Sequence, residues 1–143
     1  MLARERRMPE LRVFLDASFW IAYRNARDQS YPAALSALRG LFAARTRFVT
    51  TIPVFCEIHA FFSRHPQLRE RVLSDFLNNP VVEMEPVSHV DYEKAAQLLR
   101  AHGDKSFSFC DALSFIVMLR LGVRRVATFD VHFRQFGDFE IVV

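Results

Sequence analysis

The sequence predicts an α/β domain in which a short parallel β-sheet carries helices on both faces. Short apolar runs alternate along the chain with segments of about 10–15 residues in which apolar side chains recur at helical spacing. Parallel strands need crossover connections, and this alternating order is typical of consecutive βαβ units. A chain of 143 residues is long enough for one such domain with a buried core.

Five short apolar runs are the predicted strands. They cover residues 12–16, 48–50, 81–84, 125–130 and 139–143. Nearly continuous apolar character is typical of strands that are covered on both faces of a parallel sheet. The first and fourth runs each end in an acid, Asp16 and Asp130.

Seven segments between these runs are the predicted helices. They cover residues 17–27, 30–42, 51–62, 68–77, 88–102, 108–121 and 131–136. Two of them begin with a pattern that resembles a capping box, Ser88 with Asp91 and Ser108 with Asp111. Gly122 is predicted to end the helix that precedes it.

The composition is that of a globular protein, with 51% hydrophobic and 24% charged residues. No uncharged apolar stretch reaches the ~18 residues of a membrane helix, so no membrane association is expected. Two cysteines are too few for a disulfide framework, which favours a cytoplasmic protein. Residues 1–11 are predicted to form a flexible basic N-terminal extension, and residues 12–143 a single domain.

The charge balance has two interpretations. The formal net charge is +3, and all but Lys94 and Lys105 of the 19 cationic residues are arginine. The planar guanidinium suits phosphate, which favours a nucleic-acid partner. A mutational bias toward arginine codons explains the same count equally well, so the two interpretations stay open.

Asp16 and Asp130 each follow an apolar strand directly. Ligands of open parallel sheets bind beyond the carboxyl ends of the strands, so both acids are expected at the binding edge. An Asp in this position can equally cap the helix that follows. Either role is compatible with the sequence at each position.

Three further acids are candidates. Glu57 is flanked at helical spacing by apolar residues, so it is either a functional carboxylate or one half of a buried Glu–Arg pair. Asp111 fits a capping box but also borders the apolar face of its helix. Asp104 stands in a polar loop and is either an extra ligand or a solvated side chain.

Taken together, these acids suggest a metal site. Carboxylates that converge at one edge of a sheet repel each other, and a divalent cation removes that penalty. Magnesium uses a few carboxylates together with water and substrate phosphates, and it can activate water for attack on a phosphodiester. The hypothesis requires Glu57 to lie close to Asp16.

Motifs for several other chemistries are absent from the sequence. It contains no GxxxxGK[ST], GxGxxG, GxSxG or HExxH pattern. The phosphoaspartate pattern DxDxT fails because Ser18 stands where the second acid is needed.

Several residues near the acids have two interpretations. His132 is either a solvated side chain or a substrate contact. Phe107 and Phe109 either fill the core or stack on an unpaired RNA base. Cys56 and Cys110 are expected to be buried apolar thiols.

Four short motifs, in order and at suitable spacing, resemble those of a known family. They are Val-Phe-Leu-Asp16-Ala-Ser18, Thr-Ile-Pro-Val-Phe-Cys-Glu57, Ser-Phe-Cys-Asp111-Ala-Leu-Ser-Phe and Ala-Thr-Phe-Asp130-Val-His-Phe. The chain resembles the PIN-domain ribonucleases over residues 12–143, and among them the VapC-like toxins of type II toxin–antitoxin pairs. The basic start of the chain departs from this pattern.

The resemblance implies a three-layer α/β/α PIN-like fold and Mg²⁺-dependent hydrolysis of RNA, with Mn²⁺ as a substitute. The catalytic and metal-binding acids of the family correspond to Asp16, Glu57, Asp111 and Asp130. Ser18 and Thr128 would orient these carboxylates. Asp104 falls where some members of the family carry an additional acid.

The same resemblance implies partners. A homodimer and a small VapB-like antitoxin, which covers the acidic pocket, are expected besides the RNA substrate. Two alternatives remain: a PIN-fold module that binds RNA or protein without catalysis, and an RNA-processing nuclease that is not a toxin.

Overall fold

The structure is a computed structural model that describes residues 11–143. The prediction of a flexible extension at residues 1–11 therefore falls, except for Leu11, outside the described residues. The elements are β1 (Arg12–Leu15), α1 (Ala17–Arg24), α2 (Tyr31–Ala43), β2 (Arg47–Thr50), α3 (Ile52–Phe61), α4 (Pro66–Leu77), β3 (Val82–Met84), α5 (His89–Ala101), α6 (Phe109–Leu121), β4 (Arg125–Ala127), α7 (Val131–Phe136) and β5 (Glu140–Ile141).

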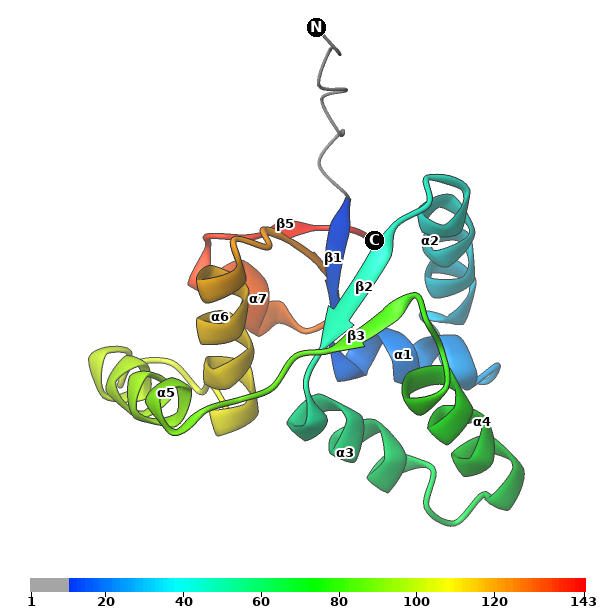
Figure 1. Ribbon diagram of the computed structural model, residues 1–143, viewed down its shortest axis with the longest axis horizontal. Helices are drawn as coiled ribbons and strands as arrows, with labels where there is room; N and C mark the ends of the chain where they lie inside the picture. The colour runs from blue at the N-terminus through cyan, green and yellow to red at the C-terminus, as the bar shows by residue number, and fades with distance from the viewer. Residues whose placement is uncertain (1–10) are drawn as a thin grey trace, which may run out of the picture.

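The strands form one parallel sheet in the order β3-β2-β1-β4-β5. Figure 1 shows α1–α4 on one side of this sheet and α5–α7 on the other. The chain builds outward from β1 to β3, then crosses back and continues from β4 to β5. Right-handed crossovers in these two directions place the helices on opposite faces. The predicted three-layer α/β/α architecture is confirmed.

The central strand is the most deeply buried part of the sheet. Val13 pairs with Phe48 on one side and with Arg125 on the other. The side chains of Val13, Phe14 and Leu15 have no solvent exposure. Alternate residues of a strand point to opposite faces, so burial of all three follows from helices on both faces.

Four helices begin at polar residues that cap them, as the sequence predicts. Asp16 and Asp130 are the N-caps of α1 and α7, and each accepts a backbone N–H two residues further on. Both predicted capping boxes, at the starts of α5 and α6, are present. Gly122 ends α6 in the left-handed conformation, with φ of 69°, which glycine adopts without steric cost.

Several predicted elements are shorter in the structure, and the strand predicted for residues 139–143 covers only Glu140–Ile141. The helix predicted for residues 17–27 ends at Arg24, because the side chain of Asn25 accepts the N–H of Arg27 and starts a turn. The strand predicted for residues 125–130 ends at Ala127. Beyond it, the hydroxyl of Thr128 replaces the strand's hydrogen bonding and accepts the N–H of Asp130.

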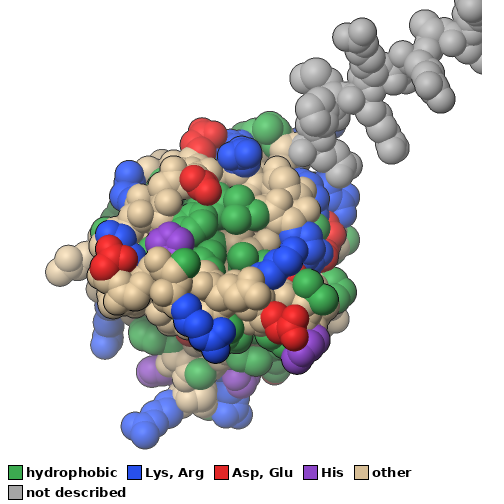
Figure 2. Space-filling view, turned by 90° about the vertical axis from the view of Figure 1, so that its left-hand side faces the viewer, with side chains coloured by type: hydrophobic (Ala, Val, Ile, Leu, Met, Phe, Trp, Pro, Cys, Tyr) green, Lys and Arg blue, Asp and Glu red, His purple; other side chains and the backbone are tan. Residues whose placement is uncertain are grey.

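The described surface has a mixed charge. Figure 2 shows one face on which basic and acidic side chains are interspersed around a central area of hydrophobic side chains. Among the helices of residues 11–143, none is long and apolar enough to cross a membrane.

Candidate active site

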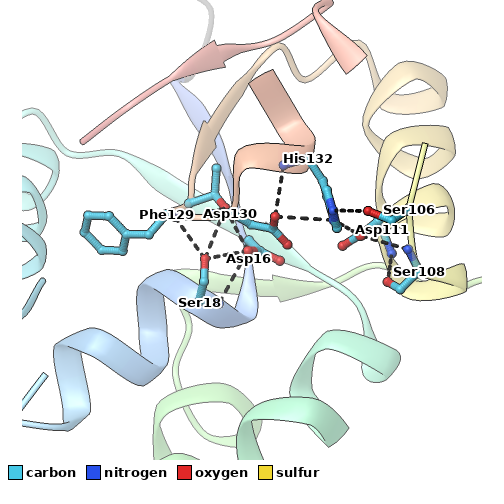
Figure 3. Close-up of polar contacts among 9 residues, drawn as sticks. Asp16, Ser18, Ser106, Ser108, Asp111, Phe129, Asp130 and His132 are labelled. Carbon is cyan, nitrogen blue, oxygen red and sulfur yellow. Dashed lines mark hydrogen bonds and ion pairs between the residues drawn. The ribbon is translucent and has the colours of Figure 1, made fainter. Parts of the chain in front are cut away.

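The candidate site lies at the carboxyl ends of β1 and β4. The chain changes its direction of growth between these two strands, which are neighbours in the sheet. Open parallel sheets form their ligand crevices at such switch points. Asp16 directly follows β1, and Asp130 follows β4 after two residues, so the topology brings both acids to one place (Figure 3).

Asp16 is held by two hydroxyl groups. The side chains of Ser18 and Thr128 both donate to Oδ2 of Asp16, each at 2.7 Å. The backbone N–H of Ser18 also donates to Oδ2, so the contacts from Ser18 and Thr128 converge on one oxygen of the carboxylate. Burial raises the pKa of Asp16, although the two hydroxyls act in the opposite direction. Asp16 therefore caps α1 and also presents a buried carboxylate.

The segment after β4 is fixed by the same hydroxyls. Oγ of Ser18 accepts the N–H of Phe129 at 2.9 Å, and Oγ1 of Thr128 accepts the N–H of Asp130 at 2.9 Å. Ser18 and Thr128 also contact each other at 3.1 Å. These contacts position the Asp130 carboxylate beside Asp16.

Asp111 projects from the first turn of α6. Its Oδ2 accepts the N–H of Ser108, which closes the capping box, and contacts Nδ1 of His132 at 2.7 Å. The residue is 8% exposed. Capping and participation in the site are again compatible, because the capping box leaves the second oxygen of the carboxylate available.

His132 is the residue whose position the sequence did not decide. Its Nδ1 lies 2.7 Å from Asp111 and 3.4 Å from Asp130, and its Nε2 lies 3.3 Å from the hydroxyl of Ser106 (Figure 3). The interpretation of His132 as a solvated side chain is therefore wrong. The available sequence signal was its place two residues after an acid that ends a strand.

Glu57 approaches the group from α3. Desolvation, and then the negative charge of Asp16, raise the pKa of Glu57, with smaller contributions from Asp111 and Asp130. Glu57 therefore lies near enough for the charges of the three aspartates to raise its pKa. Its side chain is exposed, so the alternative of a buried Glu–Arg pair is wrong.

Asp104 is not brought into this group. It is exposed in the turn after α5 and pairs with Lys105 at 3.5 Å. The donor atoms that lie within 4.8 Å of one another belong instead to Asp111, Asp130 and His132. The solvated interpretation of Asp104 fits its position.

The cysteines differ from the expectation. Cys56 is exposed, so its prediction as a buried thiol is wrong, and Cys110 is partly buried. Burial, and then the charge of Glu57, raise the pKa of Cys110 to about 12. The Cys110 thiol therefore stays protonated and serves Glu57 as a hydrogen-bond donor.

The two phenylalanines before Asp111 differ in their exposure to solvent. Phe107 is buried and packs edge-on against Phe115, with ring centroids 5.2 Å apart. Phe109 is 46% exposed on α6. Phe107 therefore fills the core, and only Phe109 is accessible for contact with a ligand.

The chemistry of the donor set fits a divalent cation. Carboxylate oxygens dominate the group, and one imidazole nitrogen lies among them. Such a set suits a hard or borderline cation, whose positive charge offsets both the repulsion and the desolvation of Asp16 and its neighbours.

A known family matches most of the chain. The PIN domain family matches residues 13–138. The protein belongs to the PIN-domain family. This result confirms the resemblance drawn from the four motifs.

Members of the PIN-domain family with known activity are similar over nearly the full length. The 23S rRNA-specific endonuclease VapC20 of Mycobacterium tuberculosis is 31% identical over 131 residues, which are 90% of this chain and 97% of that protein. The crystal structure of M. tuberculosis VapC20, described as a sarcin-ricin loop cleaving toxin, aligns with a TM-score of 0.80 and 29% identity over 92% of this chain and 99% of the other.

A second solved structure, at lower identity, is similar in fold alone. VapBC2 from Rickettsia felis, bound to a DNA fragment from its promoter, aligns with a TM-score of 0.65 and 16% identity. The alignment covers 92% of this chain and 97% of the other.

Proposed function

We propose that this protein is a metal-dependent endoribonuclease and the toxin component of a VapBC-type toxin–antitoxin pair. The convergence of Asp16, Asp111 and Asp130 at the switch point of a PIN-domain sheet carries the proposal. The similarity to the endonuclease VapC20 over nearly the whole chain supports the ribonuclease activity and the toxin class.

The metal-binding residues in this proposal are Asp16, Glu57, Asp111 and Asp130. Mg²⁺ is the proposed ion, with Mn²⁺ as a substitute, because carboxylate oxygens suit both. When bound, the ion supplies an activated water and offsets charge that develops at the phosphate.

The protein residues place the carboxylates before substrate arrives. Ser18 and Thr128 hold Oδ2 of Asp16 at the end of β1. The thiol of Cys110 donates a hydrogen bond to Glu57. Preorganised ligands of this kind need no rearrangement when the phosphodiester binds.

The chemical ends of the cleavage products follow from the use of water as the nucleophile. Attack of water on phosphorus with departure of the 3′-oxygen leaves a 5′-phosphate and a 3′-hydroxyl. A 2′,3′-cyclic phosphate would require the ribose hydroxyl as nucleophile and would contradict the proposal.

The proposed substrate is ribosomal RNA. VapC20 is named for its action on 23S rRNA and described as cleaving the sarcin-ricin loop. An exposed RNA loop presents unpaired bases and bent backbone, which proteins recognise more readily than a regular RNA duplex. A homodimer and a VapB-like antitoxin that covers the acidic pocket complete the proposed assembly.

The test is cleavage of intact ribosomes and of total RNA by the purified protein, freed of any partner, with Mg²⁺ or Mn²⁺ and with EDTA. The matched variants are Asp111→Asn and Asp91→Asn, since both acids close capping boxes but only Asp111 lies in the site. Discrete fragments that disappear with EDTA and with Asp111→Asn, and persist with Asp91→Asn, are expected. RNA binding without any cleavage would favour a module that has lost catalysis.

A further inference from the structure

One residue contacts two carboxylates of the site through different atoms. The backbone N–H of His132 donates to Oδ1 of Asp130 at 2.9 Å, and its ring nitrogen Nδ1 contacts Oδ2 of Asp111 at 2.7 Å. Asp130 is the N-cap of α7 and Asp111 lies in the first turn of α6, so the two acids come from different elements. His132 therefore joins two acids that no other contact of the described residues connects directly.

We propose that His132 is a positioning residue that holds Asp111 and Asp130 in the arrangement needed to bind the divalent cation. The proposal rests on the proposed function, since it assigns a role within the same site. His132 acts through the two carboxylates and is not itself assigned as a ligand.

The partners of the ring assign its tautomer. An ionised carboxylate only accepts hydrogen bonds, so Nδ1 carries the proton that points to Asp111. Nε2 is then the acceptor for the hydroxyl of Ser106 at 3.3 Å. Both ring nitrogens have partners, and the imidazole has a single orientation in which its donor faces the acid.

The ring is also fixed by packing. Its centroid lies 5.5 Å from that of Phe107 in an edge-on arrangement, and Phe107 is itself 8% exposed. The first turn of α7 holds the backbone of His132, because Asp130 caps that helix. A ring held from three directions can fix the rotamer of Asp111.

Positioning matters here because the two carboxylates repel each other. Their donor atoms lie within 4.8 Å, and rotation about the side-chain bonds would separate them at little cost. His132 is held rigidly and donates one hydrogen bond to Asp111 and one to Asp130, so it keeps the two carboxylate oxygens close together. Loss of such an outer contact typically weakens metal binding by about 10–100-fold.

His102 is the matched control. Its ring also packs against Phe107, with centroids 5.9 Å apart, but its Nδ1 contacts the carbonyl of Leu98 and no acid. A variant at His102 removes an imidazole from the same aromatic cluster and leaves the carboxylates untouched. It separates a general packing effect from the positioning effect.

The experiment is a titration with Mn²⁺ alone, in which the free ion is counted by electron paramagnetic resonance. His132→Asn keeps an N–H donor at the place of Nδ1, whereas His132→Gln places its amide near Nε2. We expect Mn²⁺ binding by His132→Asn within about 3-fold of the native protein, and binding about 10–100-fold weaker for His132→Gln and His132→Ala. His102→Asn is expected to bind like the native protein.

Two results would overturn the proposal. The first is that both His132→Gln and His132→Ala bind Mn²⁺ as tightly as the native protein or more tightly. This would mean that the imidazole does not position the carboxylate ligands. The second is an equal loss in His102→Asn, which would indicate packing alone. If His132→Ala fails to fold in a thermal unfolding control, the Asn and Gln variants decide.

The titration contains no RNA, so it is independent of cleavage. A native protein that binds Mn²⁺ with the expected order of variants but cleaves no RNA would refute the proposed function and leave the positioning role standing. If the native protein cleaves RNA and all variants bind Mn²⁺ like the native protein, the positioning role is refuted and the proposed function stands.

Discussion

Thr128 donates its hydroxyl to Oδ2 of Asp16 at 2.7 Å, across 112 positions of the sequence. The same hydroxyl oxygen accepts the N–H of Asp130. One threonine therefore ties the acid that follows β1 to the acid that follows β4, and 2% exposure keeps this connection out of water.

Asp16→Asn is expected to abolish RNA cleavage and to raise the melting temperature of the metal-free protein. The amide keeps the size of the side chain but removes a buried negative charge beside Asp130. Cleavage assays and thermal unfolding in EDTA measure the two effects. A clear loss of stability would instead show that Asp16 serves mainly as a helix cap.

The stability gain of Asp16→Asn is expected to depend on pH. Burial raises the pKa of Asp16, so folding favours the protonated form. This contribution is complete below the ordinary Asp pKa of about 3.9 and is lost as pH rises through the higher pKa of the folded protein. Melting temperatures in EDTA should converge near pH 4 and separate toward neutral pH, whereas a constant difference would contradict the assignment.

Thr128→Val is expected to lower both stability and cleavage. The valine keeps the shape but removes the donor to Asp16 and the acceptor for the N–H of Asp130, which costs about 1–3 kcal/mol for the unsatisfied buried group. Chemical denaturation measures the free energy of unfolding. Thr128→Ser, which keeps the hydroxyl, should retain most of the activity, and equal behaviour of the two variants would argue against an orienting role.

Glu57→Gln is expected to abolish cleavage with little change in stability. The side chain is exposed, so removal of its charge breaks no buried ion pair. The raised pKa of Glu57, caused by desolvation and then by Asp16, shows that the charge is unfavourable in the metal-free site. Cleavage and melting temperature are measured together, and a loss of about 3–5 kcal/mol would reveal a buried partner instead.

Asp91→Asn and Asp111→Asn are expected to have opposite consequences. Asp91 is 2% exposed and accepts two hydrogen bonds from Arg120, so its variant should lose about 1–3 kcal/mol of stability and keep metal binding. Asp111→Asn should keep most of the stability and lose metal binding. Denaturation and Mn²⁺ titration of both variants test this, and parallel losses would mean that the two capping boxes share one role.

The elements were predictable because their signals are local. The capping boxes at Ser88 and Ser108, the left-handed stop at Gly122 and the apolar run before Asp16 each depend on a few neighbouring residues. The predicted ends of strands and helices were less accurate where no such local signal is present. The strand predicted through Asp130 stops at Ala127, because the hydroxyls of Thr128 and of the distant Ser18 accept the N–H groups of Asp130 and Phe129.

The candidate acids were predictable as residue types, but their environments were not. The spacing around Glu57 suggested burial, yet the residue is exposed on α3. Burial depends on which helices pack nearby, and the helical period of one segment does not contain that information. For the same reason, the sequence did not decide that Asp104 is solvated and that Cys56 is exposed.

The sequence by itself determined the order of strands and helices and the family, and it marked Asp16, Glu57, Asp111 and Asp130 as candidate acids. Only the tertiary structure decided that His132 lies between Asp111 and Asp130, and that Thr128 reaches Asp16. Local patterns follow from hydrogen bonding and side-chain period within a few residues. Contacts across β1, β4, α6 and α7 depend instead on the packing of elements that are distant in the chain, which no short pattern encodes.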